Sequence, residues 1–241
     1  MELSIVLPAY KEADNLKKIL PEIHTQVSKL NIEYEILIVD TMEKMDDTFD
    51  ACKLNNAVYI TREGGNYYGD AIRTGVKKAN GKYILIMDAD GSHEPKSILE
   101  IYNKITSENL DVVVGSRYCK GGKTDNNFIL KLMSWTLNLT YKIIFALKVN
   151  DCSNSFRMYG SAKLKSLSLE CINFDIVEEI LIKLQLMYPD LAIGEVPVHF
   201  KKRDKGVSKR DLVKFILTYF VTIKKLLVLK NKEKTKVYSA K

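Results

Sequence analysis

The sequence is poor in the residues that usually bind zinc or build disulfide frameworks. It has four cysteines and three histidines in 241 residues. The cysteines show no Cys-x-x-Cys spacing and the histidines stand apart from one another, which argues against a zinc site. Scattered cysteines are typical of proteins in a reducing compartment, although the pattern excludes no individual disulfide. The cysteines are Cys52, Cys119, Cys152 and Cys171.

The chain also lacks the long apolar runs of secreted and membrane-spanning proteins. Its N-terminus starts with a strand-like segment, Leu3–Leu7, and has neither the basic nor the extended apolar region of a signal peptide. The most apolar later segment, residues 127–149, is interrupted by three lysines. A spanning helix needs about 20 consecutive, mainly apolar residues. We therefore expect no signal peptide and no transmembrane helix, and we expect 127–149 to form a helix that lies on a membrane surface.

Positive charge is present in excess. The formal net charge is +7, and many of the lysines and arginines lie toward the C-terminus. A basic, partly apolar end predicts an acidic partner, for which nucleotide phosphates, anionic lipid head groups and nucleic acid all qualify. A chain of this length can form one large domain, and its ordinary apolar content predicts a folded protein.

Short apolar segments of strand length alternate with amphipathic helical segments through the first half of the chain. This alternation predicts parallel βαβ units with right-handed crossovers. A later segment, Ala192–Phe200, contains Pro197, which favours an edge position in the sheet. We therefore predict an α/β fold with a Rossmann-like, mostly parallel central sheet flanked by helices. The five early strand segments are Leu3–Leu7, Glu35–Val39, Val58–Thr61, Tyr83–Met87 and Leu110–Val114.

Two carboxylates directly follow the fourth of these strand segments. Asp88 and Asp90 are two positions apart, so their side chains point the same way if the strand geometry continues. In open α/β sheets, ligands bind outside the carboxyl ends of the strands. A hard divalent cation, Mg²⁺ or Mn²⁺, would keep both acids ionised and bridge them to a diphosphate. The alternative is a solvated turn or a helix cap.

The C-terminal part of the chain predicts two basic elements. Residues 201–210 form a glycine-containing basic loop of the kind that clamps phosphates. Residues 212–229 predict a helix whose broad apolar face is edged by lysines. Such a helix suits a membrane surface, with core packing or a partner protein as the alternatives. Residues 231–241 are polar and lysine-rich and predict a frayed tail.

Five short motifs follow one another at a consistent spacing. They are Ser4–Glu12, Ala71–Gly75, Asp88–Asp90, Gly115–Tyr118, and Arg203 with Lys209. In this order they resemble the family-2 glycosyltransferases of GT-A fold, and within that family the group of the dolichyl-phosphate (polyprenyl-phosphate) mannose synthases. The resemblance implies a GT-A domain over 1–210 that includes the interface helix 127–149, then an amphipathic membrane-surface helix over 211–230 and the polar tail.

The resemblance implies a role for each matching residue. Asp88, Asp90 and Arg117 would act in catalysis, with Arg117 near the donor sugar or the acceptor phosphate. Asp90 would be the direct metal ligand, Ser92 stands at the position of a second one, and Mg²⁺ or Mn²⁺ would be the cofactor. Arg157 is a second candidate for holding phosphate. The residues that match the nucleotide-sugar-binding positions are Pro8, Tyr10, Glu12, Ile38, Val39, Asp40, Asp88, Ala89, Asp90, Arg117, Arg203 and Lys209.

The function that the resemblance implies is transfer of a hexose from a nucleotide sugar to dolichyl or polyprenyl phosphate, with metal dependence and inversion. Mannose from GDP-mannose is the first choice of donor, and UDP-glucose is the second. A lipid phosphate is already an anion, so the reaction demands no strong general base. The protein would lie on the cytoplasmic face of a membrane, with room for small membrane partner subunits and with no nucleic acid partner.

Two other functions stay open. One is transfer to a sugar hydroxyl of a glycan, which needs a carboxylate base such as Glu179. The other is a catalytically silent homologue that binds a nucleotide sugar, suggested by departures from the family pattern. Thr41–Glu43 replaces a second aspartate after Asp40, and Tyr67 replaces the first glycine of a Gly-Leu-Gly turn.

For three further residues, a structural role is a simpler explanation than catalysis or metal binding. His93 fits a helix-capping or surface histidine better than a metal ligand. Glu178 and Glu179 fit a solvated first turn of a helix, where the helix dipole favours negative charge.

Overall fold

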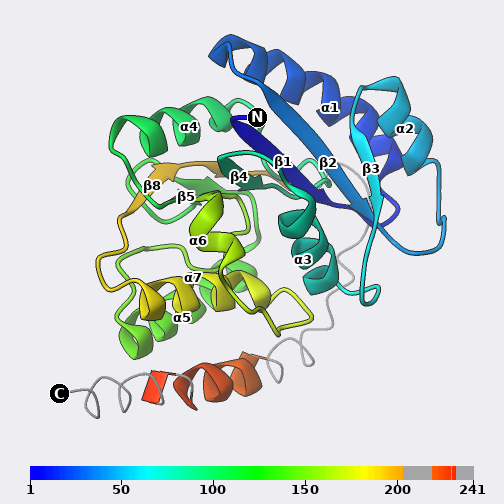
Figure 1. Cartoon of the computed structure of the whole chain (residues 1–241). Helices are drawn as coiled ribbons and strands as arrows, with labels where there is room; N and C mark the ends of the chain where they lie inside the picture. Colours follow the sequence, from blue (N-terminus) through cyan, green and yellow to red (C-terminus); the bar gives the residue numbers. More distant parts are fainter. Residues whose placement is uncertain (203–218, 229, 232–241) are drawn as a thin grey trace.

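The computed structural model describes residues 1–202, 219–228 and 230–231. A seven-stranded sheet runs through the middle of the molecule, with helices on both faces (Figure 1). A second sheet is formed by β6 (Lys123–Thr124) and β9 (His199–Phe200). The strands of the large sheet are β1 (Leu3–Pro8), β2 (Tyr34–Asp40), β3 (Val58–Thr61), β4 (Tyr83–Ile86), β5 (Val112–Ser116), β7 (Arg157–Gly160) and β8 (Ile193–Pro197).

The helices fill the connections between these strands. A short 3₁₀ helix, η1 (Ser28–Leu30), follows the first α-helix, and residues 219–228 are helical in the last described part of the chain. The α-helices are α1 (Ala13–Val27), α2 (Thr48–Leu54), α3 (Tyr68–Lys78), α4 (Ser97–Ser107), α5 (Phe128–Phe145), α6 (Ser161–Lys165) and α7 (Ile176–Met187).

The strand order creates a crevice between β1 and β4. The order across the large sheet is β3-β2-β1-β4-β7-β5-β8, and all neighbours are parallel except those of β7. From β1 the chain proceeds to β2 and β3 on one side and then returns to place β4 on the other side. This reversal is the topological switch point, where ligands of open α/β sheets bind.

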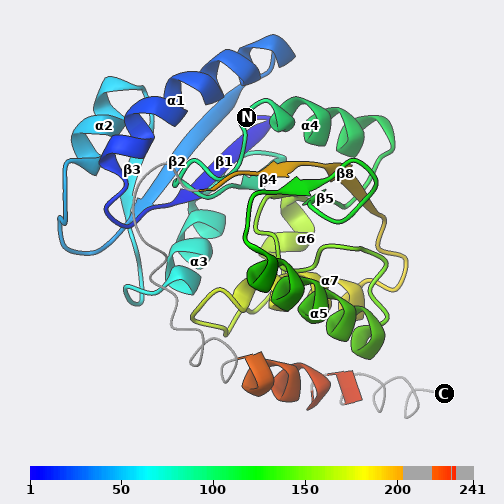
Figure 2. The ribbon, with the colours of Figure 1, turned by 180° about the vertical axis from the view of Figure 1, so that it is seen from behind.

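Both faces of the sheet are buried, and each face has its own helical layer. Helices α1, α2 and α4 cover one face, while α3, α5, α6, α7 and the helical residues 219–228 lie on the other (Figure 2). Successive strand residues alternate between the two layers, as Ile36, Leu37, Ile38 and Val39 of β2 do. A sheet covered on both sides requires strands that are apolar at every position. This requirement explains the uninterrupted apolar runs in the sequence.

The predicted α/β architecture is confirmed, and each of the five early strand segments overlaps an observed strand. β8 lies at the edge of the large sheet, as its Pro197 predicts. One strand of the large sheet was not expected. β7 pairs antiparallel to both β4 and β5, and it follows the loop that contains Asn154 and Ser155.

The start of α1 is capped by a distant residue. The helix begins at Ala13, and the preceding residue, Glu12, makes no side-chain capping hydrogen bond. The N–H group of Ala13 donates instead to Oδ2 of Asp46 (2.9 Å), and the N–H group of Thr48, at the start of α2, donates to Oδ1 of the same residue (3.0 Å). One carboxylate therefore satisfies the first turns of two helices, which stabilises both ends.

The prediction of a solvated first turn at Glu178 and Glu179 is wrong. Their exposed fractions are 5% and 1%. The carboxylate of Glu179 accepts hydrogen bonds from the N–H groups of Glu170 and Cys171 and pairs with Lys183 (2.7 Å). Burial of this charge is tolerated because it is paired and hydrogen-bonded. The residue fixes the loop before α7 to the helix.

Helix α5 has one buried and one exposed apolar face. Leu137, Tyr141 and Phe145 are buried against the rest of the protein. Phe128, Leu132, Trp135, Leu139 and Ile143 are exposed, and they recur at intervals of three or four residues, which places them on one side of the helix. Within the described part of the chain, no helix combines the length and apolarity that crossing a bilayer requires.

The helical residues 219–228 pack against α5 and the start of α7. Ile223 and Leu226 are buried, whereas Phe220, Val221 and Val228 are exposed. The hydroxyl of Tyr219 donates to the carbonyl of Leu137 (3.2 Å), and that of Thr222 donates to Oδ2 of Asp175 (2.6 Å). Core packing and an exposed apolar face, which the sequence offered as alternatives, occur together in this segment. The rest of the predicted helix 212–229 lies outside the described residues, as does most of the tail 231–241.

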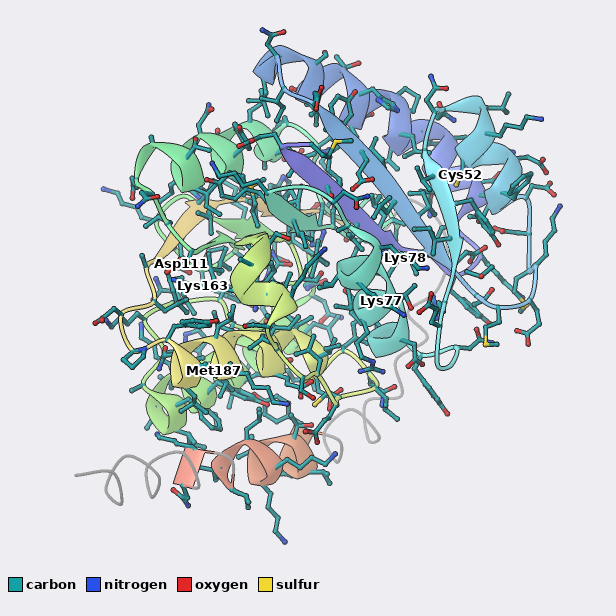
Figure 3. The ribbon with its side chains drawn as sticks, viewed as in Figure 1. Cys52, Lys77, Lys78, Asp111, Lys163 and Met187 are labelled. Atoms are coloured by element: carbon teal, nitrogen blue, oxygen red, sulfur yellow. The ribbon has the colours of Figure 1, made fainter. Side chains whose placement is uncertain are left out.

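Two contacts hold helices close to the sheet. Lys163 of α6 lies beside Asp111, just before β5, and donates to it at 2.5 Å (Figure 3). In α3, Gly75 allows the helix to approach β1 and β2. A Cβ atom at this position would lie 2.3 Å from Cγ1 of Val6 and 3.2 Å from Cγ2 of Val39. Both neighbours are rigid, fully buried β-branched side chains, so the helix can approach this closely only because residue 75 is glycine.

We expect Gly75→Ala to lower the free energy of unfolding by about 1–3 kcal/mol, because an added methyl group overpacks this interface. Denaturant unfolding followed by circular dichroism measures the change. Gly160→Ala is the matched control, since a Cβ atom there would meet its nearest neighbour only at 3.7 Å. Equal stability of the two variants would show that α3 does not depend on this close approach.

Candidate active site

A pocket of about 270 Å³ opens at the switch point, beyond the carboxyl ends of β1 and β4. The β1 wall is the loop after β1, residues 8–12, and the β4 wall is the loop after β4, residues 88–90. A third wall comes from the start of α3 and the loop before α7. The residues that line the pocket are Pro8, Ala9, Tyr10, Glu12, Arg62, Asn66, Tyr67, Tyr68, Asp88, Ala89, Asp90, Asn173 and Phe174. The structure thus brings together Pro8, Tyr10, Glu12, Asp88, Ala89 and Asp90, all predicted from the sequence.

The β1 wall is a sharp loop that hydrogen bonds from β2 and from Arg62 hold in place. The N–H group of Ala9 donates to the carbonyl of Val39 (3.0 Å), and the guanidinium of Arg62 donates to the carbonyl of Ala9. Lys11 has a φ of 57°, in the left-handed region that asparagine adopts more readily than lysine.

In the β4 wall, Asp88 is fixed through both its side chain and its backbone. Its Oδ1 atom accepts hydrogen bonds from the hydroxyls of Tyr68 (3.1 Å) and Ser155 (2.9 Å). Its N–H group donates to Nδ1 of His93 (3.0 Å). Because Nδ1 accepts this bond, the proton of the neutral ring is on Nε2, which donates to Oδ1 of Asn154 (2.9 Å).

His93 is therefore neither a surface residue nor positioned as a metal ligand. It is 1% exposed, and its ring stacks on Phe156 with centroids 4.8 Å apart. Asn154 continues the connection by donating to the carbonyl of Gly115 (2.6 Å). The histidine links the acidic loop after β4 to β5 and to the loop before β7, which the sequence did not predict.

Asp90 and Ser92 offer oxygen atoms of the kind that Mg²⁺ and Mn²⁺ prefer. Asp90 is 5% exposed and lines the pocket, and its Oδ1 accepts from the N–H group of Ser92 (3.0 Å). The buried hydroxyl oxygen of Ser92 has no hydrogen-bond partner among the described residues. No group of three or more His, Cys, Asp or Glu side chains in the described part could hold a metal ion. These residues fit an ion that takes few protein ligands and completes its shell with diphosphate oxygens and water.

Arg62 is a pocket residue that the sequence analysis missed. It follows β3 directly, is 6% exposed, and donates to the carbonyls of Asn66 (2.5 Å) and Tyr67 (3.3 Å) as well as Ala9. Burial lowers the pKa of its guanidinium, and the carboxylates of Asp40 and Asp70 act in the opposite direction. Arg62 holds the loop before α3 against the β1 wall and places positive charge beside the pocket. Its position directly after a predicted strand is the feature of the sequence that could have identified it as a site residue.

The third wall was also missed. Tyr67 and Tyr68 come from the start of α3, while Asn173 and Phe174 come from the loop before α7. The N-terminus of a helix such as α3 is a place where an anion can bind. Its own carboxylate, Asp70, occupies that place by accepting from the N–H group of Tyr67 (2.9 Å).

Arg117 does not line the pocket. It is 8% exposed and donates to both carboxylate oxygens of Asp151, at 2.7 Å each. Burial alone would raise the pKa of Asp151, but the guanidinium of Arg117 outweighs that effect and holds the pKa below its usual value. This ion pair joins the end of β5 to the loop before β7. Arg157 is fully buried and donates to the carbonyl of Val177, so no phosphate in the pocket reaches it.

Three residues at the end of β2 that were predicted to bind the nucleotide sugar do not line the pocket. Ile38 and Val39 are fully buried and point into opposite layers of the core, as neighbours in a strand must. Asp40 is 1% exposed, accepts from the hydroxyl of Tyr59 (3.3 Å), and has its pKa raised by burial. The structure brings none of the three into the pocket lining.

Arg203 and Lys209 lie outside the described residues. The described chain before them runs close to the acidic loop, since the N–H group of Lys201 donates to the carbonyl of Ser92 (2.9 Å). The ammonium group of Lys201 also lies 2.9 Å from Oε1 of Glu94.

The segment that departs most from the family pattern, residues 41–47, has defined contacts. Asn66 accepts from the N–H group of Met42 (2.8 Å) and donates to the side chain of Glu43 (2.7 Å), so it connects this segment to the loop before α3. Asp46 caps α1 and α2 as described above. The segment therefore supports the loops around the pocket.

Three curated relatives are similar to most of this chain. The dolichol-phosphate mannosyltransferase of Pyrococcus furiosus is 31% identical over 217 residues, covering 87% of this chain and 59% of the relative. The dodecaprenyl-phosphate galacturonate synthase of Rhizobium johnstonii is 27% identical, with coverages of 87% and 62%. The undecaprenyl-phosphate mannosyltransferase of Micrococcus luteus is 28% identical, with 87% of each chain covered. The chain thus spans about three fifths of the length of the first two relatives.

Solved structures share the fold. Glucosyl-3-phosphoglycerate synthase from Mycobacterium tuberculosis, in complex with Mn²⁺, UDP and phosphoglyceric acid, superposes with a TM-score of 0.73 at 17% identity, over 94% of this chain and 78% of that one. Its complex with Mg²⁺ and UDP gives a TM-score of 0.69 at 15% identity, over 92% and 79%. These likenesses confirm the predicted GT-A fold.

The sequence model of glycosyl transferase family 2 matches residues 4–167, which include the β1 wall, the acidic loop after β4 and the loop before β7. With the pocket at the switch point and the GT-A fold, this match shows that the chain belongs to glycosyl transferase family 2.

Proposed function

We propose that this protein transfers a hexose from a nucleotide sugar to the phosphate of a polyprenyl or dolichyl lipid. The observation that carries the proposal is the pocket at the switch point, which joins the Pro8–Glu12 loop to Asp88 and Asp90. Relatives named for transfer to polyprenyl or dolichol phosphates support this acceptor class. GDP-mannose is the donor we favour, because two of the three relatives are named as mannosyltransferases.

The donor would lie across the β1 and β4 walls, with its diphosphate toward Asp90. Asp90 and Ser92 would hold a divalent cation, which when bound neutralises charge on the departing diphosphate. Arg62 adds positive charge beside the pocket, and Arg203 and Lys209 remain our candidates for residues that contact the phosphates. These groups stabilise the leaving group most where its negative charge is greatest, in the transition state.

The acceptor would attack the anomeric carbon through a phosphate oxygen while the bond to the diphosphate breaks, inverting that carbon. A phosphate acceptor needs no general base, whereas a sugar hydroxyl does. Glu179, the carboxylate proposed as a base for a hydroxyl acceptor, is buried and bonded to two backbone N–H groups and Lys183. Asp151 is likewise fully buried and paired with Arg117. This engagement favours the lipid phosphate over a glycan hydroxyl.

The exposed apolar face of α5 suits an acceptor that resides in a membrane. We propose that this face and the exposed residues of 219–228 lie on the cytoplasmic leaflet, with residues 1–210 as the catalytic unit. Lys142 and Lys224 lie on these helices, and a lysine near an anionic surface adds about 1 kcal/mol of attraction. Small membrane subunits could share the same surface.

The direct test is incubation with Mn²⁺, radiolabelled GDP-mannose or UDP-glucose, and a polyprenyl phosphate. We expect labelled lipid with one of the two donors. Transfer only to sugars would support the glycan alternative, and nucleotide-sugar binding without turnover would support a catalytically silent homologue. Either result would overturn the proposed function.

We expect Asp90→Ala to lower the rate of lipid glycosylation about a thousandfold, because loss of the metal-binding carboxylate removes roughly 4 kcal/mol of transition-state stabilisation. The rate is measured with saturating Mn²⁺. Asp190→Ala, an exposed aspartate in the turn after α7, is the control and should keep full activity. Wild-type turnover in Asp90→Ala would show that this residue does not hold the metal.

Trp135 reports directly on the membrane surface, since it is the chain's single tryptophan and is 52% exposed on α5. We expect its fluorescence to shift to shorter wavelengths when vesicles containing anionic lipid are added. Ile143→Ser should weaken vesicle binding about tenfold or more, because burying an isoleucine contributes about 2 kcal/mol.

Leu54→Ser is the matched control for Ile143→Ser. Leu54 is 77% exposed but lies on α2, in the opposite helical layer, so its loss should leave vesicle binding unchanged. Point substitutions are preferable to deleting the last helix, because Ile223 and Leu226 belong to the core. No fluorescence shift, or equal effects of the two serine variants, would argue against this surface.

A further inference from the structure

Two hydroxyl groups from distant parts of the chain converge on one oxygen atom of Asp88. Tyr68, in the first turn of α3, donates to Oδ1 at 3.1 Å. Ser155, in the loop before β7, donates to the same atom at 2.9 Å. Hydrogen bonds from hydroxyls to a carboxylate are charge-assisted and stronger than those between neutral groups. Together they restrict rotation of the carboxylate at the edge of the pocket.

The ring of Tyr68 is itself fixed. It stacks on Phe174, with centroids 4.2 Å apart and planes 24° from parallel. The next residue, Gly69, donates its N–H group to the carbonyl of Ile172 (2.8 Å), and a Cβ atom there would lie 2.3 Å from the carbonyl oxygen of Cys171. The start of α3 and the loop before α7 are thus pressed together at backbone level.

The residue after Phe174, Asp175, holds the loop before α7 in place. Its Oδ1 atom accepts from the N–H group of Asn173 (3.1 Å), and its Oδ2 atom accepts from the hydroxyl of Thr222 (2.6 Å). Arg73 of α3 donates to the carbonyl of Cys171 (2.6 Å). The aromatic pair is therefore held from α3, from α7 and from the helical residues 219–228.

We propose that Tyr68 is a positioning residue that, with Ser155, sets the orientation in which Asp88 meets the nucleotide sugar. This proposal rests on the proposed function and adds a residue to it. Tyr68 and Ser155 each donate one hydrogen bond to Oδ1 of Asp88, so without the Tyr68 hydroxyl that atom would depend on Ser155. Preorganised groups act best when their own orientation is fixed by neighbours.

The experiment compares Tyr68→Phe, Ser155→Ala and the double variant. Phenylalanine keeps the ring that stacks on Phe174 and removes only the hydroxyl. We expect each single variant to lower kcat/KM for the nucleotide sugar about fivefold, because one donor remains on Oδ1. The double variant should lose about a hundredfold, more than the product of the two, because the carboxylate then has neither donor.

A second readout does not depend on turnover. Calorimetric titration with Mn²⁺ and GDP or UDP measures affinity for the nucleoside diphosphate. This affinity should fall modestly in each single variant, and in the double variant it should fall by more than the product of the two single losses. Tyr102→Phe is the matched control, since the Tyr102 hydroxyl faces a carboxylate oxygen of Glu2 at 3.5 Å, away from the pocket. Its kinetics and affinity should equal those of the wild-type protein. Melting temperatures of all the variants should stay within a few degrees of one another.

Unchanged kinetics and affinity in Tyr68→Phe, or strictly additive losses in the double variant, would overturn the proposal. A loss that follows a fall in melting temperature would also overturn it, because a structural role explains that result. If the wild-type protein transfers no sugar to lipid phosphate, the proposed function has failed. The calorimetric series then still decides whether Tyr68 and Ser155 position Asp88 for a nucleotide.

Discussion

The parallel pairing of β1 with β4 is the constraint on which the rest of the structure depends. Its register, from Leu3 opposite Tyr83 to Val6 opposite Ile86, brings the ends of the two strands to the same edge of the sheet. Pro8 and Asp88 then face one another across the pocket although they are far apart in the chain. The chain leaves β1 toward β2 and leaves β4 toward the other half of the sheet, so these two connections diverge from the gap. A crevice at this point is a consequence of topology, and the side chains determine only what it binds.

The features that the sequence predicted depend on local periodicity and on topology. Apolar runs such as Tyr83–Met87 identify strands buried on both faces, and the polar residues that follow them identify the ligand edge. Pro8, Tyr10, Glu12 and Asp88 to Asp90 were found in this way and by resemblance, and all lie in the pocket lining. Ile38 and Val39 show the limit of this reasoning, because a residue one or two positions before a strand end is still in the core.

The features that the sequence did not predict are contacts between distant segments. Glu179 was predicted to lie in a solvated first turn of a helix, and Arg117 was placed near the ligand by resemblance to the family. Each is instead buried with partners. Glu179 accepts from the N–H groups of Glu170 and Cys171 and pairs with Lys183, one helical turn further on, while Arg117 pairs with the distant Asp151. His93 likewise became a connection between strands only through Asn154. Periodicity reports which side of an element a residue lies on, but it carries no information about which distant loop covers that side.

Charged side chains with several partners explain how loops, which are usually the mobile part of an α/β protein, can hold a pocket in shape. The loops around the site connect a strand to a helix or one helix to another, and three charged side chains fasten them: Asp46 on two helix starts, Arg62 on three carbonyls, Glu179 on the loop before α7. A buried charge left without its partner is strongly unfavourable, so each such contact tends to form completely or not at all. The exposed apolar residues of 219–228 belong to the same connected structure, since Thr222 bonds the residue next to Phe174. The exposed apolar surface and the pocket are therefore joined by direct contacts, as the proposed transfer to a lipid-borne phosphate would require.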